Sequence, residues 1–232
     1  MSDAPPPPER PAERSPGDLP HACVMLFALA LTLLAAERRL LVGVAWPAFA
    51  RLVWRGRASW RPIRFGVPNA VTVLRLGLIT ALVLGSTVYE GGALAALGLA
   101  VYALDGLDGQ IARRFGLATE FGAEFDTEAD AFYIAALSLG LWARGVADAW
   151  VLLPGLLRYL YVITVTLFRW RGEAPREKFS RYSFSITAVL LSLAYYPSAA
   201  APWAAMAGTL VVSTAFWNSW RWAARPGPAP AG

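Results

Sequence analysis

Four aspartates at two helical spacings are the residues of this sequence best suited to chemistry. Asp105 and Asp108 are three positions apart, and Asp126 and Asp130 are four apart, so on helices each pair shares a face. If the two helices run antiparallel, the four carboxylates converge at one point. Carboxylates that converge repel one another, and bound cations would keep them ionised together. Oxygen-only ligands favour Mg²⁺, with Mn²⁺ as the second choice.

The chemistry expected of such a cluster is phosphoryl transfer. Two divalent ions held by four carboxylates form a clamp for a phosphorus centre, and a carboxylate not fully engaged by metal can accept a proton from an attacking hydroxyl. Gly109 and Gly122 allow a phosphate or nucleotide to approach the backbone closely, and Arg113 offers two donors to a pyrophosphate. The sole histidine, His21, and the sole cysteine, Cys23, lie outside any cluster. This excludes a metal site built from histidines or thiolates.

Long apolar segments must position these aspartates. The chain is 56% hydrophobic and 16% charged, with a mean hydropathy of +0.44, whereas soluble proteins carry about 25% charged residues. A helix needs about 20 residues to cross the hydrocarbon of a bilayer. Segments near that length are 68–89, 92–112, 126–144, 147–169, 182–199 and 202–222. The sequence therefore predicts an all-α membrane protein built as a six-transmembrane-helix bundle.

Arginines are concentrated on one side of this six-span arrangement. They precede the first span, separate the second from the third and the fourth from the fifth, and follow the sixth. By the positive-inside rule this side faces the cytoplasm, which places the aspartates near the cytoplasmic membrane surface. Topology also accounts for the net charge of +5, so we expect no nucleic-acid partner.

The two ends of the chain are predicted to lie outside the bundle. Residues 1–20 are proline-rich and predict a disordered tail, and residues 226–232 form a second, short tail. Residues 21–64 favour, in part, an amphipathic juxtamembrane helix on the cytoplasmic face. Within them, residues 21–36 form either an extra span or part of this juxtamembrane region. A cleavable signal peptide is disfavoured by the proline-rich lead and the missing cleavage site.

A longer pattern contains the aspartates. The string DGLDGQIARRFGLATEFGAEFDTEAD holds Asp-x-x-Asp-Gly-x-x-Ala-Arg, eight further residues, and Gly-x-x-x-Asp-x-x-x-Asp. It resembles the signature of the CDP-alcohol phosphotransferase family at every fixed position. The string PNAVTVLR at 68–75 is similar to the Pro-Asn-x-x-Thr-x-x-Arg string at the start of that family's first span. The resemblance covers residues 68–222 and implies six spans and a homodimer.

The resemblance implies attack by an acceptor hydroxyl on the β-phosphorus of a CDP-linked donor, with release of CMP. Asp105, Asp108 and Asp126 would be metal ligands, and Asp130 would contact metal and accept the proton. Bacterial members with this layout reside in the cytoplasmic membrane and use CDP-diacylglycerol, whose tails lie among the membrane lipids. Contacts to the CDP donor would come from Asn69, Thr72, Gly109, Arg113, Thr119 and Gly122.

The acceptor side rests on three basic residues. Arg158 lies in an apolar span, which is costly unless it faces a polar cavity; we expect it to line the acceptor site, with snorkelling or structural pairing as the alternative. Lys178 and Arg181 would anchor a phosphate or would serve as positive-inside charge. Their string, REKFSRYSFSIT, departs from the Gly-Lys-x-Lys-Thr string that follows the fourth span in phosphatidylglycerophosphate synthases.

These features predict a small polar, phosphorylated alcohol as acceptor, of the glycerol phosphate or inositol phosphate type. A different CDP-linked donor, or an unphosphorylated alcohol, is the alternative within the family. A divalent-cation transport protein is the alternative from another class. A transporter would be expected to place its acidic residues near the midplane of several helices, whereas here they lie at the ends of two adjacent ones.

Overall fold

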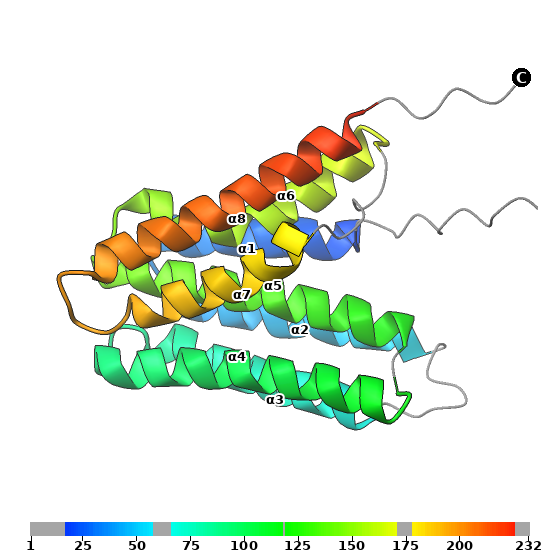
Figure 1. Cartoon of the computed structure of the whole chain (residues 1–232), viewed down its shortest axis with the longest axis horizontal. Coiled ribbons are helices and arrows are strands. Elements are labelled where there is room, and N and C mark those ends of the chain that lie inside the picture. Colours follow the sequence, from blue (N-terminus) through cyan, green and yellow to red (C-terminus); the bar gives the residue numbers. More distant parts are fainter. Residues whose placement is uncertain (1–16, 58–65, 118, 171–177, 226–232) are drawn as a thin grey trace, which may run out of the picture.

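The computed structural model describes residues 17–57, 66–117, 119–170 and 178–225, without the side chains of 108, 111–113 and 178–181. These described residues form helices and no strand, which confirms the predicted all-α class (Figure 1). The elements are α1 (Leu19–Ala35), α2 (Arg38–Gly56), α3 (Val67–Gly85), α4 (Gly91–Arg114), α5 (Glu120–Ala143), the 3-10 helix η2 (Ala149–Leu152), α6 (Leu153–Leu167), α7 (Lys178–Leu193) and α8 (Ala201–Ala223).

The helices run along the long axis of the molecule, and helices that follow one another in the chain run in opposite directions (Figure 1). The starts of α1, α3 and α5 lie at the same end as the ends of α2, α4, α6 and α8, on the right of Figure 1. We call it the arginine-rich end, after Arg51, Arg55, Arg57, Arg114, Arg169, Arg221 and Arg225. The opposite end carries Arg38, Arg39 and Arg144.

Each of the six predicted apolar segments contains a helix, but α4 and α5 extend further toward each other than expected. The connection between them is residues 115–119, instead of the loop of about a dozen residues that the apolar pattern suggests. The helix begins early because the Thr119 hydroxyl accepts a hydrogen bond from the Gly122 amide at 2.9 Å and caps α5. Gly116, at φ +63°, turns the chain between the two helices.

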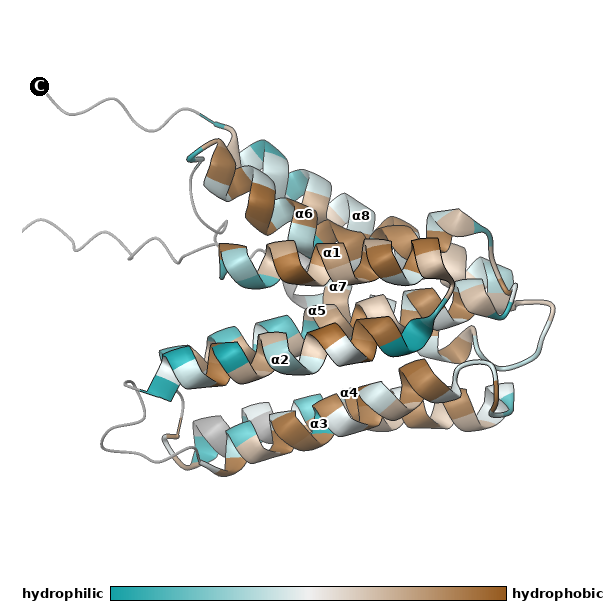
Figure 2. Cartoon of the chain, turned by 180° about the vertical axis from the view of Figure 1, so that it is seen from behind, coloured by the Kyte–Doolittle hydropathy of each residue, from teal (hydrophilic) through white to brown (hydrophobic). Residues whose placement is uncertain are grey.

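The N-terminal region folds back on itself as a helical hairpin. α1 begins at Leu19, inside the segment predicted as a tail, and residues 1–16 and 226–232 of the two predicted tails lie outside the described residues. α2 packs lengthwise against α1, so the two helices lie side by side along the bundle (Figures 1 and 2). The cause is a buried stripe on α2 at helical spacing: Leu41, Ala45, Ala48, Phe49 and Leu52. The amphipathic juxtamembrane helix on the cytoplasmic face stays a prediction.

Buried hydroxyls tie the central helices together. The Tyr133 hydroxyl on α5 donates to the Gly98 carbonyl on α4 at 2.7 Å and lies 2.9 Å from Ser192 Oγ on α7. The Tyr195 hydroxyl donates to the Leu137 carbonyl at 2.9 Å. Because buried polar groups need partners, these bonds fix the relative positions of α4, α5 and α7.

Among the described residues, two helical segments are long and apolar enough to cross a bilayer: Val67–Gly85 and Ala149–Leu167. Three shorter helical stretches are also apolar: Leu19–Ala35, Gly91–Leu107 and Tyr182–Leu193. Figure 2 shows hydrophobic residues along the outward faces of several helices, α3 among them. The six-span bundle and the extra span at 21–36 stay predictions.

A first testable consequence concerns the contact between α5 and α6. A Cβ on Gly155 would lie 2.7 Å from the Cα of Ala135, so Gly155→Ala must push the two helices apart and should destabilise the protein by about 1–3 kcal/mol. Gly77 is the matched control, because a Cβ there meets nothing within 4 Å. Thermal unfolding in detergent should show a lower midpoint for Gly155→Ala and an unchanged or higher one for Gly77→Ala. Equal midpoints would refute the tight contact.

Candidate active site

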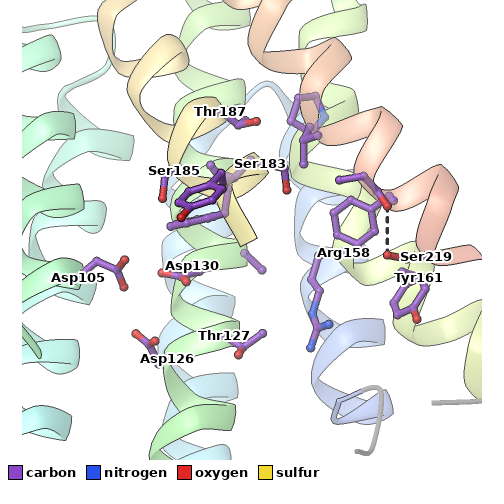
Figure 3. A pocket seen from close by; sticks show the side chains of 18 of the residues that line it. Asp105, Asp126, Thr127, Asp130, Arg158, Tyr161, Ser183, Ser185, Thr187 and Ser219 are labelled. Atoms are coloured by element: carbon purple, nitrogen blue, oxygen red, sulfur yellow. Dashed lines mark hydrogen bonds between the residues drawn. The ribbon is translucent and has the colours of Figure 1, made fainter. Parts of the chain in front are cut away.

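Three of the four predicted aspartates converge. Asp105 comes from α4, and Asp126 and Asp130 come from α5; one carboxylate oxygen of each lies within 4.8 Å of the others. Figure 3 shows Asp126 and Asp130 on the side of α5 that faces Asp105. The backbone of Asp108 lies in α4, one turn beyond Asp105, but its side chain is outside the described part of the structure. Its membership of the cluster therefore stays a prediction.

A buried arginine lies at the centre of the cluster. The Arg75 side chain is fully buried, and its Nη1 is 3.0 Å from Asp105 Oδ1 and 2.6 Å from Asp126 Oδ1. Its Nη2 donates to Asp130 Oδ1. A guanidinium presents five donors in a rigid fork, so one side chain fixes the positions of all three carboxylates.

Arg75 was not among the site residues predicted from the sequence. Two signals could have found it: Arg75 closes the string PNAVTVLR, and it lies inside an apolar segment, where an arginine is costly unless it is paired. The segment also supplies too few acids to pair it locally. Its partners therefore had to come from elsewhere in the chain.

The contact between α3 and α5 also brings predicted donor-binding residues together. Asn69, Thr72 and Arg75 follow one another at three-residue spacing on α3, and all three are buried. A Cβ on Gly122 would lie 3.2 Å from Asn69 Oδ1, so the absence of a side chain at Gly122 permits this approach. Thr72 Oγ1 donates to the Pro68 carbonyl at 3.2 Å.

The charges of the cluster suit a divalent cation. Three carboxylates face one guanidinium, which leaves an excess of two negative charges in a partly buried place. Arg75 contacts the Oδ1 atoms of Asp105, Asp126 and Asp130, and every carboxylate also has a second oxygen. Carboxylate oxygens are the ligands that Mg²⁺ and Mn²⁺ prefer. The donor set therefore fits such an ion.

A cavity of about 580 Å³ opens beside the cluster, between α4, α5, α6, α7 and α8. Asp105, Asp126 and Asp130 lie on one wall, and Arg158 of α6 lies on the other side of α5 from them (Figure 3). Arg158 also donates from Nη2 to Glu128 Oε1 at 3.2 Å, so it both lines the cavity and pairs structurally. The remaining polar groups in the lining are Thr127, Tyr161, Tyr182, Ser183, Ser185, Thr187 and Ser219.

The other predicted site residues are placed in part. Gly109 lines the cavity, and Thr119 caps α5. Arg113 lies within α4, and Lys178 and Arg181 lie within α7, but their side chains are outside the described part of the structure. Their proposed contacts to donor and acceptor are therefore untested.

The match to a family model extends over residues 65–216, which is more than half of the chain, and the family is described as CDP-alcohol phosphatidyltransferase. This chain belongs to that family of membrane-embedded transferases.

Two similar proteins carry more specific descriptions. One, from Mycobacterium tuberculosis, is described as a probable phosphatidylglycerophosphate synthase; it is 30% identical over 151 residues, which cover 61% of this chain and 71% of the relative. The other, from Pseudomonas fluorescens, is described as a CDP-diacylglycerol–glycerol-3-phosphate 3-phosphatidyltransferase. It is 34% identical over 116 residues, covering 48% of this chain and 59% of the relative. No solved structure matches the chain.

Proposed function

We propose that this protein transfers a phosphatidyl group from CDP-diacylglycerol to a hydroxyl of a small phosphorylated alcohol, of the glycerol phosphate or inositol phosphate type, and releases CMP. One observation carries the proposal. The cluster of Asp105, Asp126 and Asp130 around Arg75 opens onto a cavity that is also lined by Arg158. A metal-bound donor at the cluster and the phosphate of an acceptor at Arg158 could therefore occupy the same cavity. The descriptions of both relatives support glycerol phosphate as the acceptor.

The proposed step is a single displacement at phosphorus. The acceptor hydroxyl oxygen forms a bond to the β-phosphorus of the donor, the bond from that phosphorus to the oxygen of CMP breaks, and the hydroxyl proton passes to Asp130. Bound Mg²⁺ or Mn²⁺, two ions in our proposal, would neutralise the phosphate oxygens. Asp105, Asp108, Asp126 and Asp130 would hold these ions, and Arg75 keeps the described members of this group in place.

The donor would lie along the face that α3, α4 and α5 share at the arginine-rich end. Gly122, which lies close to Asn69, and Asp126 are one helical turn apart on α5. The contact between α3 and α5 is therefore next to the carboxylate cluster. A nucleotide placed there would reach the cluster with its phosphates. The contacts proposed for it come from Asn69, Thr72, Gly109, Arg113, Thr119 and Gly122.

We further propose six membrane spans, α3 to α8, with the active site on the cytoplasmic side. The support is the larger number of described arginines at the arginine-rich end, where α4 ends and α5 begins. The diacylglycerol tails would then lie among the membrane lipids. The homodimer implied by the family resemblance is part of the same proposal.

The acceptor is proposed to bind with its phosphate against Arg158, helped by Lys178 and Arg181. A guanidinium at the cavity wall suits a phosphate, which it can bind through two hydrogen bonds. With CDP-diacylglycerol and Mg²⁺, purified protein should release CMP with glycerol 3-phosphate at least about tenfold faster than with glycerol, because loss of a charged contact costs this much.

Inositol phosphate and free inositol serve as the second pair in this assay, and EDTA should stop the release of CMP with every acceptor. Equal rates with glycerol and glycerol 3-phosphate would contradict the phosphorylated acceptor. An unaffected rate in EDTA, with metal removal verified by elemental analysis, would contradict the metal-dependent mechanism.

A further inference from the structure

Helix α5 carries a second pair of carboxylates that the proposed reaction does not use. Glu124 and Glu128 are four residues apart and so share a face of α5. The Glu128 side chain is 1% exposed. Its Oε1 accepts a hydrogen bond from Arg158 Nη2 at 3.2 Å, and its Oε2 lies 3.8 Å from His21 Nε2 of α1. A buried carboxylate therefore links the N-terminal hairpin to the arginine on the cavity wall.

Gly17, in the chain segment that precedes α1, lies close to both Arg158 and Glu128. Gly17 has φ +129°, a backbone conformation that residues other than glycine rarely adopt. A Cβ on Gly17 would lie 3.0 Å from Arg158 Nη2 and 3.1 Å from Glu128 Oε1. This Cβ would also lie 3.2 Å from Val162 Cγ2, so a methyl group added at Gly17 requires these side chains to shift by a few tenths of an ångström.

A separate set of ion pairs holds this segment in place. Asp18, which is buried, pairs with Arg51 and lies 3.5 Å from Arg55, both on α2. Arg55 also pairs with Glu124. The start of α1 is thereby fixed to α2 and to the first turns of α5. All of these N-terminal residues precede residue 65, where the match to the family begins.

We infer that residues 17–21 and Glu128 hold the Arg158 guanidinium in the orientation that binds the acceptor's phosphate. Gly17, His21 and Glu128 are positioning residues that act through Arg158, and the inference rests on the proposed function. A guanidinium held at Nη2 presents its planar group to a phosphate in a fixed orientation. Restraining a long side chain in advance lowers the entropy lost on binding. The acceptor site is thus completed by a segment outside the family-matching region.

The test compares two glycine substitutions at positive φ. Gly17→Ala places its methyl group against Arg158 and Glu128, whereas Gly145→Ala, at φ +68°, meets nothing within 4 Å. We expect Gly17→Ala to raise the KM for glycerol 3-phosphate about tenfold, with the KM for CDP-diacylglycerol and kcat within about twofold of wild type. Gly145→Ala should match the wild type in all three constants.

The effect must also depend on Arg158. In an Arg158→Ala background, Gly17→Ala should leave the KM for glycerol 3-phosphate unchanged, because interacting residues give non-additive effects. If Gly17→Ala does not fold, His21→Phe replaces it: the ring still packs on Phe49, whose centroid is 4.9 Å away, but the nitrogen near Glu128 is lost.

An active Gly17→Ala or His21→Phe variant with an unchanged acceptor KM would overturn this inference alone. If Gly17→Ala raises the KM for glycerol 3-phosphate equally in the wild-type and Arg158→Ala backgrounds, the inference is also overturned, because the segment then does not act through Arg158. If the wild type releases no CMP with glycerol 3-phosphate, the proposed function fails, and this inference fails with it.

Discussion

Asp130→Asn should lower kcat about 1000-fold while the Kd for CDP-diacylglycerol changes by less than about threefold, because general-base catalysis is worth 10²–10⁴ in rate. Asparagine has nearly the same shape as aspartate, but it cannot accept the hydroxyl proton. The other two carboxylates of the cluster keep their contacts to Arg75. The measurement is single-turnover CMP release, with binding of CDP-diacylglycerol followed separately.

Asp148→Asn is the matched control for this substitution. Asp148 precedes η2, at the opposite end of the bundle from the arginine-rich end, so its loss should leave kcat unchanged. Turnover by Asp130→Asn within about tenfold of the wild type would remove Asp130 as the proposed base.

Arg75→Lys should lower kcat about 100-fold, because a lysine ammonium cannot contact three carboxylates in the fixed geometry that a guanidinium provides. In the structure, two nitrogens of Arg75 reach oxygens of Asp105, Asp126 and Asp130. Arg75→Leu should also destabilise the protein by about 1–3 kcal/mol, because it leaves three partly buried carboxylates without the positive charge between them. The measurements are steady-state kcat and thermal unfolding in detergent.

The control for Arg75→Lys is Arg144→Lys. Arg144 donates to the carbonyls of Ser86 and Tyr89 at 2.9 and 3.0 Å, contacts that an ammonium group can also make. This control should keep wild-type kcat. A kcat for Arg75→Lys within threefold of the wild type would show that Arg75 does not position the cluster.

Helix positions were predictable where apolar residues dominate, and less so around the aspartates. Asp126 marks the expected start of a span, yet α5 begins at Glu120. The acidic residues of the first turns lower the local hydropathy, but the cap at Thr119 and the contacts of Phe121 and Phe125 with the core sustain the helix. The convergence of the aspartates was predicted from their helical spacing on two antiparallel helices, and the structure confirms it for Asp105, Asp126 and Asp130.

The parts of the site that were not predicted depend on contacts between segments that are distant in the sequence. Arg75 contacts Asp130, which is 55 residues later in the sequence, and no local pattern predicts which residue pairs with a buried arginine. Gly17 reaches Arg158 over a still longer separation. Both contacts arise from the packing of α3 and α1 against α5 and α6, and the periodicity of a single segment does not encode such packing.

The central claim is phosphatidyl transfer at the aspartate cluster. The most direct measurement follows both halves of CDP-diacylglycerol, labelled in the cytidine and in the acyl chains, with purified protein, Mg²⁺ and glycerol 3-phosphate. We predict one CMP for each phosphatidyl group found on the glycerol phosphate, with both products formed about 1000-fold more slowly by Asp130→Asn. The account would be contradicted if folded wild-type protein released no CMP with glycerol 3-phosphate, glycerol, inositol phosphate or inositol. It would also be contradicted if CMP were released with phosphatidic acid as the sole lipid product.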